Sequence, residues 1–270
     1  MHQLSTANQP GGPTPIRVRN LEIKMAGSPA EIDAAQALRY QVFYQEMSAK
    51  PSANMKQQQR DFDRFDAFCD HLIILDHDLK TKTPPVIATY RFMRREAAKK
   101  CGQFYSQDEY NIDCLIDHAG EIMELGRSCV AIPYRNGLVM QLLWRGVVEY
   151  VRFYDVQLMF GCASLPGTTI DNLAVSLSYL HHFHQAPPEL RAKALAKRYV
   201  HMNLLPKDQI DEKNAMFTLP PLIKGYLRLG GFIGDGAVID DQFNTTDVNV
   251  VVKMALVTDK YVKHYYGRTE

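Results

Sequence analysis

The sequence predicts an α/β or α+β protein that forms one domain. Short apolar, strand-like segments alternate with amphipathic helical segments along the chain. A strand-turn-helix-strand pattern lies in the middle, and neither an internal repeat nor a long linker interrupts the chain between Leu21 and Tyr266. With 270 residues, 46% of them hydrophobic, the chain is long enough to bury a substantial core.

The first predicted helix begins at Ser28. Residues 1–18 are rich in Gln, Gly, Pro and Ser, which predicts a disordered leader before a domain over residues 19–268. Ser28 is followed by Pro and, three positions later, by Glu, a pattern typical of a helix start. Strands are predicted next at residues 71–76 and 86–92, on either side of a turn rich in Thr, Lys and Pro.

The β-α-β pattern occupies the middle of the chain. It consists of a strand at residues 122–132, a long amphipathic helix at 138–154 and a strand at 157–163. Beyond it, we expect a largely helical region over residues 171–200 and a final strand over 247–258.

Composition excludes several classes of protein. A net charge of +1 argues against a dedicated nucleic-acid-binding protein. Five scattered cysteines without a C-x-x-C pair predict reduced thiols, not disulfides or a zinc site. No segment has the roughly 20 apolar residues that span a bilayer, and the N-terminus lacks the apolar run of a secretory signal. We expect a cytoplasmic protein, with attachment to the inner membrane surface left open.

Two charged residues interrupt the apolar strand at residues 122–132. Burying Glu124 or Arg127 without a partner is costly, so the pair is either a structural ion pair or part of a site. A spacing of three places them on opposite faces of a regular strand. We predict a β-bulge near Gly126 that turns both side chains toward one cleft.

The turn before the long helix is a candidate anion site. Arg135, Asn136 and Gly137 precede a helix start, where backbone N–H groups favour a phosphate of coenzyme A or phosphopantetheine. The alternative is an ordinary helix start with an asparagine cap.

Other polar motifs predict no metal site and no nucleophile. The acidic run at residues 60–66 lacks the glycine and closing glutamate of a calcium loop. It is expected instead to bind a cationic amine or to pair with Arg39 and Arg91. His181–His184 has no companion ligands, and Cys162 and Ser164 lie outside any G-x-S-x-G elbow. Residues 191–198 are expected to form a basic helix, either a solvated face or a dock for an acidic carrier protein or anionic lipid.

Several motifs in fixed order carry a family resemblance. They are ALRYQVFYQEM, DFDRFDAFCDHLIILD, ATYRFMRREAA, FYSQDEYNI, MELGRSCVAIPYRNGLVMQLLWRGVVEYV, LMFGCASLPGT and LPPLIKGYLRLGGFIGDGAVIDDQFNTTDVNVVVKM. Over residues 21–266 the chain resembles the ornithine-lipid N-acyltransferases, bacterial enzymes of the GNAT fold that are sometimes called hemolysin-like. The resemblance implies a single GNAT-like domain with a central mixed, mostly antiparallel sheet flanked by helices.

The resemblance also implies an activity. Such an enzyme transfers a 3-hydroxyacyl group from an acyl carrier protein thioester to the α-amino group of ornithine, giving lyso-ornithine lipid, and needs no bound cofactor. Acyl-CoA is the alternative donor, and glycine or another amino acid the alternative acceptor. An acetyl-CoA-dependent GNAT enzyme and a non-catalytic module that binds a carrier protein or lipid remain as other interpretations.

A more distant similarity, to the acyl-homoserine-lactone synthases, implies polar site residues. Those matched here are Arg39, Phe43, Asp63, Asp66, Arg91, Glu124 and Arg127. The tryptophan that follows the first helix in those synthases is missing, because the only tryptophan here is Trp144.

These resemblances imply a role for each site residue. Glu124 is expected to take the proton of the amine, directly or through water. Arg91 and Arg127 are expected to hold the acceptor carboxylate or the acidic residues around it. Backbone N–H groups of Ser128, Cys129 and Val130 would stabilise the oxyanion, and Arg135, Asn136 and Gly137 would contact the phosphopantetheine phosphate. An apolar channel for the acyl chain would lie along Leu142, Trp144 and Phe160; the alternative, which these residues favour, is that they belong to the ordinary core.

Overall fold

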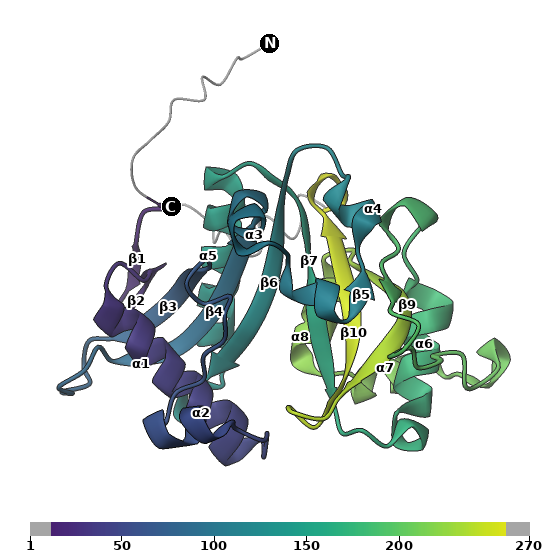
Figure 1. The fold of residues 1–270 in the computed structure, drawn as a ribbon, viewed down its shortest axis with the longest axis horizontal. Helices are drawn as coiled ribbons and strands as arrows, with labels where there is room; N and C mark the ends of the chain where they lie inside the picture. The colour runs from purple at the N-terminus through teal and green to yellow at the C-terminus, as the bar shows by residue number, and fades with distance from the viewer. Residues whose placement is uncertain (1–11, 258–270) are drawn as a thin grey trace, which may run out of the picture.

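The computed structural model describes residues 12–257, and these contain a ten-stranded mixed sheet with helices on both faces (Figure 1). The strand order is β1-β2-β3-β4-β6-β7-β10-β9-β8-β5. Among the described strands only the β6–β7 and β8–β9 pairs are parallel. The strands are β1 (Ile16–Val18), β2 (Leu21–Met25), β3 (Asp70–Asp76), β4 (Val86–Arg94), β5 (Tyr110–Asn111), β6 (Glu121–Val130), β7 (Val156–Pro166), β8 (Lys193–Ala194), β9 (Phe232–Asp240) and β10 (Thr245–Lys253). The predicted single GNAT-like domain with a mostly antiparallel sheet is confirmed.

The helices of the described chain are short apart from α1 and α5. They are α1 (Pro29–Tyr40), α2 (Ala53–Gln58), α3 (Arg95–Cys101), α4 (Asp113–Ile116), α5 (Gly137–Phe153), α6 (Ala174–His184), α7 (Glu212–Thr218) and α8 (Pro221–Arg228). A π-helical turn, η1 (Gln41–Glu46), continues α1, and a 3-10 turn, η2 (Tyr105–Asp108), precedes β5.

Helices α1 and α5 cover opposite faces of the sheet (Figure 1). Successive side chains of a strand point to opposite faces. Accordingly, Ile73 and Leu75 of β3 pack with Ala35 of α1, whereas Leu72 and Ile74 belong to the core that contains α5. The face that carries α1 is called the α1 face below.

Most of the predicted elements are confirmed. Helix α1 begins as expected, with the Ser28 side chain accepting a hydrogen bond from the N–H of Glu31. The predicted leader ends inside the sheet, because residues 16–18 form β1 and pair with β2. Residues 1–11 and 258–270 lie outside the described residues. The expected helical region over 171–200 is wrong in its second half, since α6 ends at His184 and only short turns and β8 follow.

Strands β6 and β7 separate in the middle of the sheet. Their parallel pairing ends at Glu124 and Phe160, although β6 continues to Val130 and β7 to Pro166. At the point of separation a Cβ on Gly161 would lie 2.3 Å from the carbonyl oxygen of Leu125. Only glycine lets the two backbones approach so closely here before they diverge.

The predicted bulge in β6 is confirmed. Arg91 and Thr89 of β4, two residues apart, pair with Gly126 and Cys129, which are three residues apart. Arg127 occupies the extra position with a φ of 53°, a left-handed conformation that a non-glycine residue seldom adopts. The extra residue turns the Arg127 side chain to the α1 face, where it joins Glu124.

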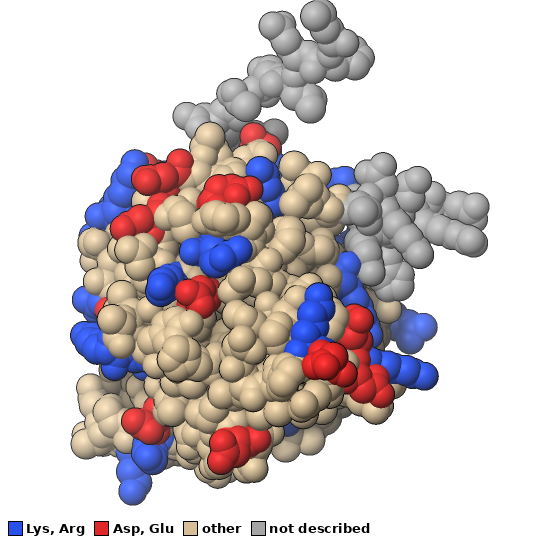
Figure 2. All heavy atoms as spheres, turned by 90° about the vertical axis from the view of Figure 1, so that its right-hand side faces the viewer, with Lys and Arg blue, Asp and Glu red and all other residues tan. Residues whose placement is uncertain are grey.

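No helix in the described part of the chain is long and apolar enough to cross a membrane. Figure 2 shows the side of the molecule that carries α6 and α7. Lysines and arginines are interspersed there with acidic side chains around a largely uncharged centre.

Candidate active site

A cavity of about 550 Å³ opens where β6 and β7 diverge. Its walls come from β6, β7, β10, the start of α5, the start of α8 and the π-helical turn η1. The apolar side chains among its lining residues include Met140, Met159, Phe160, Leu222, Val250 and Val252. The cavity therefore joins an apolar lining to the exposed backbone of the two separated strands.

The structure separates the three residues considered for the acyl channel. Phe160 lines the cavity, but Leu142 and Trp144 are buried in the core between α5 and the sheet and are not among its lining residues. Trp144 packs edge-on against Tyr226 of α8, with 5.3 Å between the ring centroids.

The predicted phosphate-binding turn lies at the edge of the same cavity. Arg135, Asn136 and Gly137 all line it. Asn136 caps α5 by accepting a hydrogen bond from the N–H of Val139 at 3.1 Å. Arg135 donates from Nε to the carbonyl oxygen of Val130 at 2.9 Å and pairs with Glu46. The positive end of the α5 dipole therefore faces the cavity beside an arginine.

The predicted oxyanion segment lines the cavity too. Ser128, Cys129 and Val130 are among its wall residues. Because of the bulge and the divergence, Arg127 and Ser128 have no partner residue in the β4 or β7 registers. Their backbone groups are thus free of the regular ladder and can meet a ligand.

A buried ion network lies beneath the cavity on the α1 face. Arg39 is completely buried and binds Asp61 at 2.7 Å through Nε and Asp66 at 2.7 Å and 2.8 Å through its Nη atoms. Arg91 continues the network to Asp63 at 2.7 Å and to Asp66 at 3.3 Å. The arginines outweigh burial and hold the pKa values of Asp63 and Asp66 below their usual range.

Only part of the predicted substrate-binding set touches the cavity. Phe43, Arg91 and Arg127 line it, whereas Arg39, Asp63 and Asp66 lie behind them. The resemblance implied all of these residues, and the structure divides them into a layer that lines the cavity and a layer that supports it.

Arg127 forms a charged part of the cavity wall. Its guanidinium carbon lies 4.5 Å from the ring centroid of Phe243 and 5.0 Å from that of Tyr105. Nη2 contacts Asp63 at 3.3 Å, and Nε, which is buried, has no hydrogen-bond partner among the described residues. That Nε lies 3.5 Å from Oδ2 of Asp61, so the guanidinium charge is balanced by Asp61 and Asp63.

Glu124 is buried beside the cavity and does not line it, so the prediction that Glu124 and Arg127 face one cleft is wrong. Its Oε2 accepts a hydrogen bond from the N–H of Tyr105 at 2.7 Å. Its Oε1 accepts from the N–H of Ser106 at 2.7 Å and from the Ser106 hydroxyl at 2.5 Å. Burial raises the pKa of Glu124 despite these three donors. Ser106 Oγ lies 3.5 Å from Sγ of Cys162, which does line the cavity.

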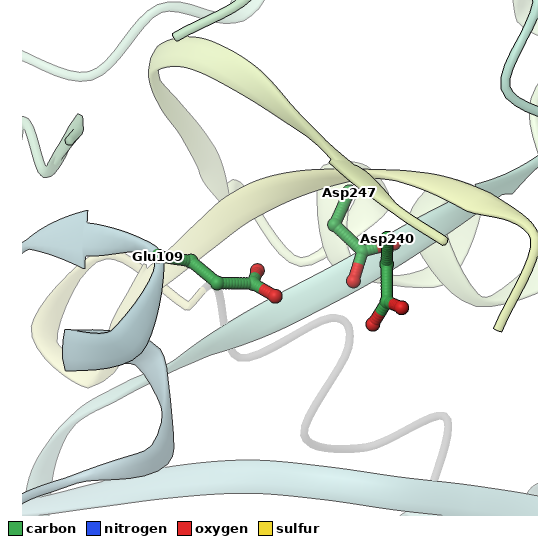
Figure 3. A group of neighbouring side chains, drawn as sticks. All are labelled: Glu109, Asp240 and Asp247. Atoms are coloured by element: carbon green, nitrogen blue, oxygen red, sulfur yellow. The ribbon is translucent and has the colours of Figure 1, made fainter. Parts of the chain in front are cut away.

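The structure also brings together an acidic cluster that sequence reasoning missed. One carboxylate oxygen from each of Glu109, Asp240 and Asp247 lies within 4.8 Å of the others (Figure 3). Asp240 and Asp247 line the cavity, and Glu109 approaches them from the segment after η2. Asp247 lies at the start of the strand predicted at residues 247–258, next to polar residues, so it does not stand out in the sequence as Glu124 does.

The acidic cluster predicts an unusual dependence of stability on pH. Burial and the neighbouring carboxylates raise the pKa of Glu109 to about 7 and that of Asp247 to about 6. The carboxyl groups of Glu109 and Asp247 therefore bind their protons more tightly in the folded protein than in the unfolded chain. The free energy of unfolding should decrease as the pH rises from about 4 to about 7 and these protons are lost. We expect Glu109→Gln to raise the free energy of unfolding at pH 8 by about 1–3 kcal/mol and to change it little at pH 5.

Denaturant unfolding at the two pH values measures this effect, with the exposed Glu189→Gln as the control. An equal change in stability at pH 5 and pH 8 would contradict the expectation.

The predicted basic helix at residues 191–198 is wrong. Arg191 donates to the carbonyl oxygen of Ala186 at 2.6 Å, and Lys193 lies in β8. Arg198 donates to the carbonyl oxygens of Asp108 and Ile239 and lies 3.6 Å from Oε1 of Glu109. These contacts hold the segment against β9 and η2, and Arg198 supplies one positive charge to the acidic cluster.

Comparison of the sequence with known proteins finds a matching domain family and several similar enzymes. Residues 38–145 match the family described as an acetyltransferase (GNAT) domain. The chain is 44% identical over 252 residues to the L-ornithine Nα-acyltransferase of Brucella abortus (strain 2308), covering 92% of this chain and 90% of that one. It is 43% identical to the enzyme of the same name from Rhizobium meliloti (strain 1021), over 93% and 86% of the two chains.

Among solved structures, a CoA-dependent acyl-homoserine lactone synthase aligns with a TM-score of 0.47 and 11% identity, over 88% of this chain and 84% of that one.

Proposed function

This chain belongs to the L-ornithine Nα-acyltransferase family, and from that premise we propose that it moves a fatty acyl group from an acyl carrier protein thioester to the α-amino group of ornithine. The observation that carries the proposal is the cavity between the separated strands β6 and β7. It combines an apolar lining, strand backbone that is not paired between β6 and β7, and the start of α5. An acyl thioester needs these three surroundings, for its chain, its carbonyl group and its phosphate.

The proposed reaction is direct acyl transfer. The neutral α-amine attacks the thioester carbon, a C–N bond forms, and the C–S bond breaks as the tetrahedral intermediate collapses. The amine gives up a proton, and the phosphopantetheine thiolate takes one as it leaves. Backbone N–H groups of residues 128–130 would stabilise the oxyanion. No enzyme nucleophile is needed.

We propose that Glu124 is the final acceptor of the amine proton. Both of its oxygens already accept hydrogen bonds, so the proton would travel through the Ser106 hydroxyl and the Cys162 thiol at the cavity wall. Burial raises the pKa of Glu124, which suits a group that accepts a proton during the reaction. Arg127, which lines the cavity, would hold the acceptor carboxylate with its guanidinium group.

The proposed donor enters at the start of α5. Arg135 and the first turn of the helix would bind the phosphopantetheine phosphate. Three exposed apolar side chains lie on segments at this edge of the cavity: Met47 is 47%, Ile132 56% and Leu138 43% exposed. We propose that this rim contacts the carrier protein or, because the product is amphiphilic, the inner membrane surface.

Product analysis by mass spectrometry tests the proposal. The purified protein is given a 3-hydroxyacyl carrier protein and a mixture of amino acids, and parallel reactions contain the acyl-CoA or acetyl-CoA. N-acyl ornithine from the carrier protein thioester supports the proposal. N-acyl glycine or another N-acyl amino acid changes the acceptor, and turnover with acetyl-CoA alone contradicts the lipid function.

Arg135→Ala tests how the donor is bound. Loss of one arginine–phosphate contact is expected to raise the KM for the acyl carrier protein about tenfold or more, with little effect on kcat. Arg17→Ala, which removes an exposed arginine on β1, is the control and should leave both constants unchanged. A fall in kcat with an unchanged KM would place Arg135 outside the donor site.

A further inference from the structure

The acidic cluster of Glu109, Asp240 and Asp247 has no part in the acyl transfer described above. We propose that it binds the side-chain ammonium group of the acceptor and so selects a cationic amino acid over an uncharged one. This inference rests on the proposed function, because it assigns the acceptor end of the same cavity.

Three separate segments hold the carboxylates in place. Asp240 ends β9, and its Oδ1 accepts hydrogen bonds from the N–H groups of Gln242 and Phe243 at 2.8 Å and 3.0 Å. Asp247 lies on β10, and its Oδ1 accepts from the Thr245 hydroxyl at 2.9 Å. These contacts fix both aspartates at the cavity wall while the strands continue past them.

Glu109 points into the cluster with one oxygen unsatisfied. Its side chain is 2% exposed, and Oε2 has no hydrogen-bond partner among the described residues. Figure 3 shows its carboxylate directed toward Asp247 from the opposite side of the cluster. A buried carboxylate oxygen without a donor is costly, and a ligand that brings N–H groups would remove that cost.

The charges of the cluster are not balanced by the protein. Within residues 12–257, neither Asp240 nor Asp247 forms an ion pair, and Arg198 reaches only Oε1 of Glu109, at 3.6 Å. Asn249, two residues after Asp247 on the same face of β10, is also fully buried with both side-chain atoms unsatisfied. The cluster itself thus has three carboxylates and one nearby arginine.

An ammonium group fits the spacing of these oxygens. It offers three N–H donors, and three acceptors placed tetrahedrally at about 2.8 Å from the nitrogen lie about 4.6 Å apart. The cluster oxygens all lie within 4.8 Å of one another. The raised pKa values of Glu109 and Asp247 agree with a site that lacks its cation.

Acceptor selectivity tests the inference. L-norvaline has the carbon skeleton of ornithine without the terminal amine, so the ratio of kcat/KM for the two acceptors isolates the ammonium group. We expect Asp247→Asn to lower this ratio about tenfold or more, because kcat/KM for ornithine falls. The value of kcat/KM for norvaline should stay within about threefold of that of the wild type. Asp241→Asn, an exposed neighbour of Asp240, is the matched control and should leave the ratio unchanged.

A binding measurement gives an independent readout. Calorimetry of ornithine binding in buffers of different ionisation enthalpy should show proton release near pH 6.5, because the bound cation lowers the pKa values of the carboxylates. Norvaline should release none. Besides the three carboxylates, the charged and titratable groups that bear on this pH response are Arg127, Arg198, Tyr110 and Cys162.

Three results would overturn the inference. Asp247→Asn could lower kcat/KM equally for ornithine and norvaline, which would indicate a general structural or catalytic role. It could leave the ratio unchanged. Chelation by EDTA could abolish selectivity and Mg²⁺ or Ca²⁺ restore it, which would make the cluster a metal site. Wild-type protein that makes no N-acyl ornithine would contradict the proposed function itself, a separate outcome.

Discussion

Replacing Arg39 with methionine is expected to lower the free energy of unfolding by about 3–5 kcal/mol. Arg39 is completely buried, and its guanidinium donates four hydrogen bonds, three to the carboxylates of Asp61 and Asp66 and one to the backbone carbonyl oxygen of Asp61. Methionine fills much of the space but leaves two buried carboxylates without their main partner. The midpoint temperature of thermal unfolding should fall by about 6–15 °C for a domain of this size.

Arg60→Met is the matched control for Arg39. Arg60 forms a two-pronged pair with Asp33, with both contacts at 2.8 Å, but this pair lies at the surface. Exposed ion pairs of this kind contribute about 1 kcal/mol or less. Equal losses in the two variants would show that the buried network on the α1 face is not a major source of stability.

Replacing Glu124 with glutamine is expected to lower kcat by about 10²–10⁴-fold. Glutamine has nearly the same shape but cannot take a proton, and its NH₂ group would face a donor from Tyr105 or Ser106. Wild-type kcat should decline at pH values below the pKa of Glu124, and the residual activity of the variant should lack that decline. Steady-state kinetics from pH 5 to pH 9 would measure both effects.

Ser106→Ala separates proton transfer from support of the cavity wall. It removes the hydroxyl between Glu124 and Cys162, while the backbone N–H groups of Tyr105 and Ser106 still hold the carboxylate. We expect a loss of kcat with this variant too, without a comparable loss of stability. If both variants turn over within about threefold of wild type with unchanged pH profiles, Glu124 only holds the Tyr105–Ser106 segment.

Sequence patterns predicted the fold well where they were strongly periodic. The strands around residues 71–76 and 86–92 and helix α5 follow the periods of 2 and 3.6 that burial of one face imposes. The segment at residues 191–198 was misread because Ala, Leu and Lys favour a helix in isolation. Arg198 instead binds backbone carbonyl oxygens of the distant residues Asp108 and Ile239, a tertiary effect that outweighs propensity.

The candidate site was predictable where a local rule was broken. Glu124 and Arg127 stand out in an apolar strand, and the assumption that both charged side chains point to one side predicted the bulge that the structure contains. The acidic cluster has no such local signature as a whole. Glu109, Asp240 and Asp247 are brought together only because β10 inserts between β7 and β9 and the segment after η2 packs against them. Strand order between segments far apart in the chain cannot be predicted from any short stretch of sequence.

The short stretch from Tyr105 to Glu109 supplies both the donors that hold Glu124 and one carboxylate of the acidic cluster. Evolution therefore has little freedom to retune acceptor choice through this stretch, since any shift of its backbone also disturbs the proposed proton acceptor. Asp240 and Asp247 do not lie on the segment that holds Glu124. A lineage that came to acylate a different amino acid would be expected to diverge first at the end of β9 and the start of β10, and an engineer seeking new N-acyl amino acids should begin there.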